Sequence, residues 1–169
     1  KGLILYHGVG TGKTCSAITL SENFRDMYER KNKKIIILTP TDNVQKGWRR
    51  NIYDENKGLD QCTGDIYTDI FNEDIQTFNV ERNVESKIKK TINKYYEFYG
   101  YGEFAGKINK KISNRVTNYP MSERKKMTKI IEKDIIKEYF SNRLLIIDEF
   151  HNLRSNYEEE DVDINKRSL

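Results

Sequence analysis

With 169 residues and a formal net charge of +4, the chain is long enough for one domain with a substantial core, and no apolar run approaches the ~20 residues that cross a bilayer. Its two cysteines, Cys15 and Cys62, are too few for a disulfide framework or a cysteine metal cluster, so we expect two buried or inert thiols in a reducing compartment. Residues 82–143 carry 16 basic and 7 acidic side chains, a net charge of +9. This excess favours contact with a polyanion, although lysine-rich helices are often only solvated faces.

The first predicted element is a buried strand over residues 2–6, which are apolar and show no helical period. It leads into the stretch HGVGTGKTCS, after which apolar residues recur at close to helical spacing over residues 13–30. A strand, a glycine-rich loop and Gly-Lys-Thr at the start of a helix are typical of a phosphate-binding loop, because glycines let backbone N–H groups converge on an anion. The usual pattern has a further glycine where this chain has His7.

In such a loop, the lysine reaches the β- and γ-phosphates of a nucleotide, and the hydroxyl of the next residue is a Mg²⁺ ligand. We expect Lys13 to bind the phosphates and Thr14 to be the Mg²⁺ ligand. The helix is expected to begin near Lys13, so that the positive end of its dipole also faces the phosphates. ATP and Mg²⁺ are therefore the predicted cofactors. The predicted nucleotide-binding residues are Gly8, Val9, Gly10, Thr11, Gly12, Lys13, Thr14 and Cys15.

A second buried strand is predicted over residues 35–38, which are β-branched on both faces as in parallel sheets. The sequence Thr-Pro-Thr-Asp over 39–42 ends this strand and caps a helix that continues to about Tyr53. We expect Trp48, within this helix, to pack in the core. Strands alternating with helices predict a right-handed parallel α/β unit.

Beyond a polar, weakly patterned region over 55–93, the aromatic segment KYYEFYGY at 94–101 predicts another strand. Residues 103–113 predict a short helix, and residues 122–140 show the clearest amphipathic pattern in the chain. We interpret the apolar stripe of the second helix as a core or helix-packing face.

The last predicted strand, residues 144–147, is followed by Asp-Glu-Phe-His. A phosphate loop needs a carboxylate that holds Mg²⁺, normally at the carboxyl end of a neighbouring parallel strand, and Asp148 meets this need. Glu149 is placed to polarise the attacking water as a general base. The two half-motifs, each at the end of a predicted strand, together predict an ATP-type phosphate site.

The segments GTGKT, LTPT and LLIIDEFH resemble motifs I, Ia and II of superfamily 2 helicases of the DExH branch. The aromatic YYEFYGYGEF, followed by AGKI, is similar to a segment between those motifs in helicase-like NTPases of large DNA viruses, including poxvirus-type transcription factors. The resemblance covers about residues 1–154. It implies an α/β fold, a RecA-like P-loop domain whose parallel sheet is flanked by helices, with an α-rich insert between motifs Ia and II.

Within that fold we expect a core over about 1–54 and 94–154, insert-like segments over about 55–93 and 105–140, and an acidic loop over 155–169. The function implied by the resemblance is the ATP-binding motor domain of a nucleic-acid-dependent ATPase. Such a domain couples Mg-ATP hydrolysis to translocation on, or remodelling of, DNA or RNA, and viral transcription is the expected setting.

The resemblance also implies roles for single residues. The catalytic set is Lys13, Asp148, Glu149 and His151, and the Mg²⁺ ligands are Thr14 and Asp148, the latter through water. His151 would transmit the nucleotide state to a second motor domain. Pro40 and Thr41, at the start of a helix, resemble the motif Ia element that touches the backbone of a bound strand. The candidate nucleic-acid contacts, including lysines of the basic segment at helical spacing, are Pro40, Thr41, Tyr101, Lys107, Lys110 and Lys111.

Nothing similar to motif III, or to motifs IV to VI with their arginine finger, follows His151. We therefore expect a second RecA-like domain in the same polypeptide, and near-background hydrolysis by this chain alone. Expected partners are nucleic acid and subunits of the transcription machinery, with no membrane. The expected location is intracellular, in the virion or the host cytoplasm. Two other hypotheses stay open: a non-catalytic nucleotide- or nucleic-acid-binding module of a transcription complex, and another phosphate-loop ATPase of the clamp-loader kind.

Overall fold

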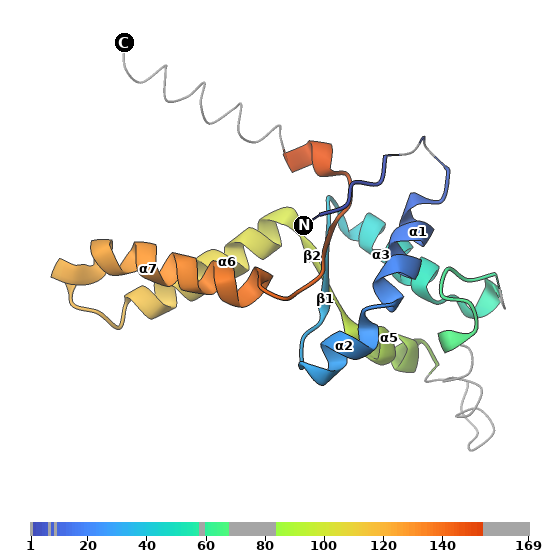
Figure 1. Cartoon of the computed structure of the whole chain (residues 1–169), viewed down its shortest axis with the longest axis horizontal. Coiled ribbons are helices and arrows are strands. Elements are labelled where there is room, and N and C mark those ends of the chain that lie inside the picture. Colours follow the sequence, from blue (N-terminus) through green and yellow to red (C-terminus); the bar gives the residue numbers. More distant parts are fainter. Residues whose placement is uncertain (1, 7, 9, 58–59, 68–83, 154–169) are drawn as a thin grey trace, which may run out of the picture.

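A computed structural model of the chain describes residues 2–6, 8, 10–57, 60–67 and 84–153. A three-stranded parallel sheet lies at its centre, with helices on both sides (Figure 1). The strands are β1 (Ile35–Thr39), β2 (Tyr96–Gly100) and β3 (Leu145–Ile147). The α-helices are α1 (Lys13–Glu22), α2 (Arg25–Arg30), α3 (Asp42–Ile52), α5 (Val84–Tyr95), α6 (Tyr101–Val116) and α7 (Met121–Phe140). Two 3-10 turns, η1 (Glu55–Lys57) and η3 (Phe150–Leu153), complete the described elements.

The sheet has the order β2-β1-β3, and both pairings are parallel, with Ile37 opposite Phe98 on one side and Ile146 on the other. All five residues of β1 are buried, as expected for a central strand that is covered on both faces. The predicted parallel α/β class is confirmed, and so are the strands predicted near residues 35, 96 and 145. The strand β3 was expected to be buried, but its residues are half-buried.

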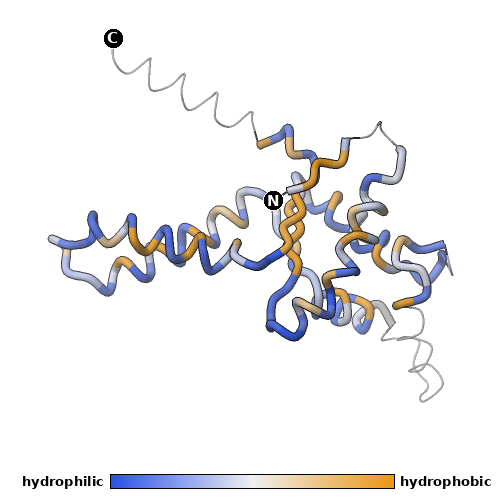
Figure 2. Tube along the Cα trace, in the orientation of Figure 1, coloured by the Kyte–Doolittle hydropathy of each residue, from blue (hydrophilic) through white to orange (hydrophobic). Residues whose placement is uncertain are grey.

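The alternation of side chains along β1 divides the core into two clusters. Ile35 and Ile37 point to one face, where α1, α3 and α5 cover the sheet and Trp48 is buried as predicted. Ile36 and Leu38 point to the other face and pack against α6 and α7. The strands β1 and β3 form the hydrophobic centre of the molecule in Figure 2.

The helices α6 and α7 form a hairpin that projects away from the sheet (Figure 1). Both were predicted, and both begin one or two residues before the expected start. Their contact is apolar at the base, where Phe104 lies edge-on to the Tyr139 ring, while Ile131 and Ile135 are buried further along. Part of the apolar stripe over residues 122–140 is thus a helix-packing face, as expected, whereas Ile130 and Ile136 of the same stripe are 45% and 44% exposed.

The predicted strand over residues 2–6 is wrong. Leu3, Ile4 and Tyr6 are 68%, 88% and 95% exposed, and the segment is not part of the sheet. An apolar run forms a strand only where a neighbouring strand edge offers enough unpaired N–H and C=O groups, and the outer strand β3 is only three residues long. Residues 13–30, whose apolar spacing indicates one continuous helix, form two helices with a break at Asn23 and Phe24.

No helix in the described part of the chain has the length and apolar character needed to cross a bilayer. The acidic segment predicted as a loop over 155–169 lies outside the described residues, as do His7 and Val9.

Candidate functional site

The loop before α1 has the backbone shape of a phosphate loop. Gly10 and Gly12 have φ angles of 77° and 80°, a left-handed conformation that glycine adopts without steric cost. A Cβ atom at either position would meet no atom within 4 Å, so the backbone angle, and not crowding, favours glycine here. Gly12 is also the N-cap of α1 and offers no side-chain cap, which leaves the first-turn N–H groups at an uncapped helix start.

Two side chains converge on one carbonyl of this loop. The Lys13 ammonium donates to the Gly8 oxygen at 2.9 Å, and the Thr11 hydroxyl donates to the same oxygen at 2.8 Å. The ammonium is therefore folded over the loop, on the side where its backbone turns. Thr14 is half-buried in the first turn of α1, and its hydroxyl has no hydrogen bond within the described part of the chain.

These donors fit the predicted cofactors. An uncapped helix start, a left-handed glycine loop and an ammonium group are the groups that bind a polyphosphate. A hydroxyl oxygen next to them is a hard ligand, of the kind that Mg²⁺ prefers. For Cys15, only the backbone N–H is available to a phosphate, because its sulfur is bonded elsewhere in the fold. Val9, also predicted in this set, lies outside the described residues.

The carboxylate of Asp148 is held in place from two directions. Its backbone N–H donates to the Leu38 oxygen at 2.9 Å, which extends the pairing of β3 with β1 by one residue. Its Oδ2 accepts a 2.7 Å hydrogen bond from the indole Nε1 of Trp48, a residue only 3% exposed. The second carboxylate oxygen, Oδ1, has no partner in the described part of the chain and is the one that a metal-bound water could use.

The link between Trp48 and Asp148 was missed by sequence reasoning, which placed the tryptophan only in the core. A signal did exist, because a buried indole N–H needs an acceptor. The sequence could not say which acceptor it is, since the two residues lie 100 positions apart.

Glu149 occupies a backbone conformation that is unusual for its residue type. Its φ is 52°, in the left-handed region, directly after the last strand residues. The chain then turns into η3, with Asn152 N–H donating to the Glu149 oxygen at 2.9 Å. The carboxylate of Glu149 is about half exposed and lies 3.2 Å from Nδ1 of His151. The turn thus aims the predicted general base out of the sheet and pairs it with the predicted coupling residue.

Tyr101, at the start of α6, supports the same turn. Its hydroxyl donates to the backbone oxygens of Asp148 and of Glu149, the second at 3.3 Å. Burial raises the pKa of this phenol, and the carboxylates of Asp148 and Glu149 raise it further, so it remains a neutral donor at neutral pH. The predicted contact of Tyr101 with nucleic acid stays a prediction, and its hydroxyl is already occupied within the chain.

The predicted contacts at Pro40 and Thr41 lie at the same edge of the sheet. Thr41 is exposed and caps α3 as predicted, accepting a 3.4 Å hydrogen bond from the Val44 N–H. Because Leu38 pairs with Ile147 in a parallel register, the ends of β1 and β3 lie side by side. The structure therefore places the start of α3 beside the Asp148 turn, and Figure 1 shows the phosphate loop toward the same end of the sheet.

The three predicted lysines have different environments. The Lys107 ammonium donates to the Tyr99 hydroxyl and lies 4.3 Å from the centre of that ring. Lys111 forms a 3.4 Å ion pair with Glu138 on α7. Lys110 is exposed on α6. Lys107 and Lys111 thus already have partners within the hairpin.

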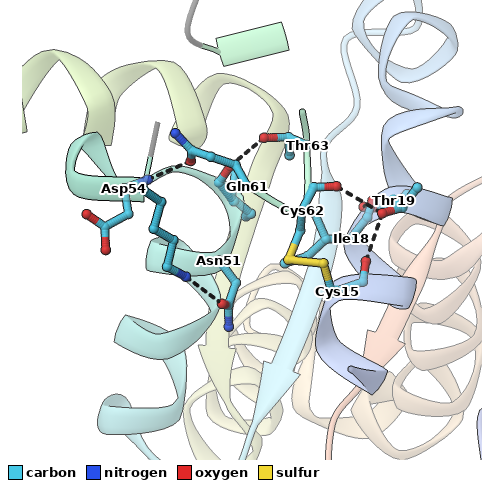
Figure 3. Close-up of a disulfide and its surroundings, with 11 residues drawn as sticks. Cys15, Ile18, Thr19, Asn51, Asp54, Gln61, Cys62 and Thr63 are labelled. Carbon is cyan, nitrogen blue, oxygen red and sulfur yellow. Dashed lines mark hydrogen bonds between the residues drawn. A yellow bond between two sulfur atoms is a disulfide. The ribbon is translucent and has the colours of Figure 1, made fainter. Parts of the chain in front are cut away.

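The prediction of two free thiols is wrong, because Cys15 and Cys62 are joined by a disulfide (Figure 3). Spacing gave no sign of it, since the cysteines are 47 residues apart and meet only through the packing of α1 beside the turn that follows α3. Cys62 lies in that turn, and its carbonyl accepts a 2.9 Å hydrogen bond from the Thr19 hydroxyl of α1.

Comparison with known proteins agrees with the geometry. Residues 1–167 match the family described as type III restriction enzyme, res subunit. The chain is 32% identical over 173 residues to the "Putative ATP-dependent RNA helicase L377" of Acanthamoeba polyphaga mimivirus, and 30% identical over 171 residues to the "Putative helicase 087L" of Invertebrate iridescent virus 3. Each alignment covers 96% of this chain but 14% of the relative.

A further mimivirus relative, the "Putative ATP-dependent RNA helicase R563", is 32% identical over 160 residues, which cover 92% of this chain and 22% of that protein. The chain thus spans less than a quarter of the length of these relatives. No solved structure matches it.

Proposed function

This chain belongs to the ResIII family of helicase-type NTPase domains, and we propose that it binds Mg-ATP and couples hydrolysis to movement along, or remodelling of, DNA or RNA. The observation that carries the proposal is the pairing of two half-sites at one end of a parallel sheet. One is the uncapped start of α1 behind a left-handed glycine loop. The other is the Asp148–Glu149 turn after β3.

The proposed roles follow from these positions. The first-turn N–H groups of α1 and the Lys13 ammonium bind the phosphates, which the lysine does by exchanging the Gly8 carbonyl for a stronger acceptor. Thr14 and Asp148 hold Mg²⁺, which when bound neutralises charge on the phosphates. Glu149 accepts a proton from the attacking water, and His151, 3.2 Å from its carboxylate, transmits the nucleotide state to a second motor domain.

The test is steady-state ATP hydrolysis by the full-length protein, with and without single-stranded DNA and RNA. We expect turnover that rises when nucleic acid is added. Binding of ATP without turnover above a Lys13→Ala control would contradict hydrolysis and favour a non-catalytic binding module. RNA is the first nucleic acid to test, because two of the relatives carry the words RNA helicase in their names.

Substituting Trp48 by phenylalanine tests the support of the metal-binding carboxylate. Phenylalanine keeps an aromatic ring in the core but removes the Nε1 donor that holds Oδ2 of Asp148. Loss of such an outer hydrogen bond typically lowers metal affinity or activity about 10-fold or more. We therefore expect the Mg²⁺ concentration for half-maximal hydrolysis to rise by about that factor, measured by titrating Mg²⁺ at saturating ATP.

Tyr67→Phe is the matched control for this substitution. It also removes a hydrogen bond to a carboxylate, that of Tyr67 to Glu22 at 3.1 Å, but in the buried cluster at α1 and not at the Asp148 turn. It should leave the Mg²⁺ dependence unchanged. An unchanged Mg²⁺ dependence in Trp48→Phe would contradict the role given to the indole.

We propose that the hairpin of α6 and α7 contacts nucleic-acid phosphates through its exposed lysines. On α7, four exposed lysines recur at spacings of three or four residues, which places them on one face of the helix. This face is distinct from the one that buries Ile131 and Ile135. The proposed α7 surface is Lys126, Lys129, Lys133 and Lys137, and Lys110, exposed on α6, is a separate proposed contact.

Replacing Lys126, Lys129, Lys133 and Lys137 with glutamine should weaken binding to all sequences alike. The slope of log affinity against log salt concentration should fall by up to about 0.7–0.9 for each phosphate that the protein no longer neutralises. Binding is measured by fluorescence anisotropy at several salt concentrations. Lys107 and Lys111 are also proposed contacts, but their side chains have partners inside the hairpin, so replacing both with glutamine should lower the slope less than the α7 variant does. An equal slope in the wild-type protein and both variants would identify the α7 face as a solvated surface.

The setting that we propose is viral transcription, with a second RecA-like domain closing over the nucleotide. Support comes from the relatives, all three of which are viral and much longer than this chain. Superfamily 2 motors act with paired domains, so the Glu149–His151 pair would face such a partner domain. Transcription subunits are then the expected protein partners.

A further inference from the structure

The disulfide joins the phosphate-loop helix to the turn that follows α3 (Figure 3). Cys15 is the third residue of α1 and directly follows Lys13 and Thr14. Cys62 belongs to the turn over residues 61–65. The two Cα atoms lie 5.0 Å apart, a separation at which cysteines can be bridged without moving the backbone. A covalent bond thus holds the helical turn that carries two predicted nucleotide ligands.

The turn on the other side of the bond is firmly anchored to the end of α3. The buried Thr63 hydroxyl donates to the Ile52 oxygen at 2.7 Å, and the Gln61 side chain accepts from the Asp54 N–H at 2.8 Å (Figure 3). The bond therefore connects α1 to a fixed point of the domain.

The thiols would stay adjacent after reduction. The Thr19 hydroxyl, one turn after Cys15, bonds to the Cys15 oxygen at 3.0 Å and to the Cys62 oxygen at 2.9 Å. Ile18, between Cys15 and Thr19 on α1, is fully buried in the main core cluster. These contacts hold α1 against the turn without the sulfur–sulfur bond, so the pair can open and close without refolding.

Small reagents can reach the pair from one side. A surface groove of about 340 Å³ lies between α1 and the turn, and Cys62 contributes to its wall. Both cysteines are half-buried, so neither is sealed in the core. The other lining residues of the groove are Thr19, Glu22, Asn23, Thr63, Gly64 and Ile66.

We propose that Cys15 and Cys62 form a reversible oxidation site that takes low-molecular-weight disulfides such as glutathione disulfide, and that its state sets the affinity of the phosphate loop. In the first step, the Cys62 sulfur attacks one sulfur of glutathione disulfide, forming a mixed disulfide and releasing one glutathione thiol. The Cys15 sulfur then displaces the second glutathione. The protein loses two electrons and two protons, and glutathione disulfide gains them to become two thiols.

The direction of the effect follows from preorganisation. With the disulfide closed, the first turn of α1 is fixed to the anchored turn, so less conformational freedom is lost when a nucleotide binds. The oxidised protein should therefore bind Mg-ATP about 3- to 10-fold more tightly than the reduced protein. This inference rests on the proposed nucleotide site, whereas formation of the disulfide can be measured without it.

The experiment equilibrates the full-length protein in a series of glutathione redox ratios. Alkylation and peptide mass spectrometry report the state of Cys15 and Cys62, and calorimetry reports the Kd for Mg-ATP. We expect the pair to change from thiols to disulfide across the series while the Kd falls about 3- to 10-fold. The variants Cys62→Ser and Cys62→Ala cannot form the disulfide, so each should bind Mg-ATP with the Kd of the reduced wild-type protein at every redox ratio.

If Cys15 and Cys62 still react with the alkylating reagent in excess glutathione disulfide, the proposed oxidation site is wrong. If the disulfide forms but the Kd for Mg-ATP does not change, the proposed control of affinity is wrong. Absence of ATP binding in both states would overturn the proposed nucleotide site and, with it, that control. The peptide measurement would in that case still show separately whether the pair is oxidised.

Discussion

Replacing Lys13 with alanine in the full-length protein is expected to lower kcat/KM for ATP hydrolysis by about 100- to 1,000-fold, the range for loss of one preorganised group that stabilises transition-state charge. The structure gives the reason, because the ammonium is already folded over the loop by its bond to the Gly8 oxygen. Charge on the transferred phosphoryl group would replace the Gly8 oxygen as the acceptor of this nearby ammonium. ATP affinity should fall as well, since the same ammonium binds the ground state.

The matched control is Lys46→Ala, which removes an exposed lysine from α3, outside the phosphate loop. It should leave kcat/KM unchanged. The measurement is steady-state hydrolysis over a range of ATP concentrations, with circular dichroism showing that the helical content is retained. Equal activity of Lys13→Ala and Lys46→Ala would contradict the phosphate-loop assignment.

The parts of the fold that sequence predicts well are those whose local pattern agrees with their packing. Residues 35–38 are apolar on both faces, and β1 is covered by helices on both faces. Thr41 was expected to cap a helix, and its hydroxyl accepts the N–H of Val44. The same holds for α7, whose apolar stripe became the buried residues Ile131, Ile135 and Tyr139.

The parts that sequence does not predict depend on which distant residue becomes a neighbour. Residues 2–6 have a strand-like composition, but pairing is decided by where an unpaired strand edge lies. Nothing local indicates that Trp48 donates to Asp148, or that Cys15 bonds to Cys62. The site motifs were predictable because their spacing is short, whereas the contacts that hold them in place are long-range.

The second large effect is expected for Glu149→Gln, which should lower the turnover number for ATP by about 100- to 10,000-fold, the contribution of a general base. The amide has nearly the shape of the carboxylate but cannot take a proton from water. Glutamine tolerates the left-handed backbone at this position about as well as glutamate does, so the turn after β3 should keep its φ of 52°. Unlike Lys13→Ala, this variant should bind ATP with unchanged affinity. Single-turnover kinetics measures the loss in the hydrolysis step, and calorimetry measures the affinity for ATP separately.

A second variant distinguishes a catalytic role of Glu149 from a purely structural one. Glu149 lies 3.2 Å from Nδ1 of His151, so the loss could arise because the pair is broken and not because a base is missing. His151→Ala removes Nδ1 and so breaks the same pair, and it leaves the carboxylate in place. If Glu149 is the base, His151→Ala keeps most of the single-turnover rate and loses mainly the stimulation by nucleic acid. Equal losses of the single-turnover rate in both variants would show that the pair, and not proton transfer by Glu149, is what hydrolysis requires.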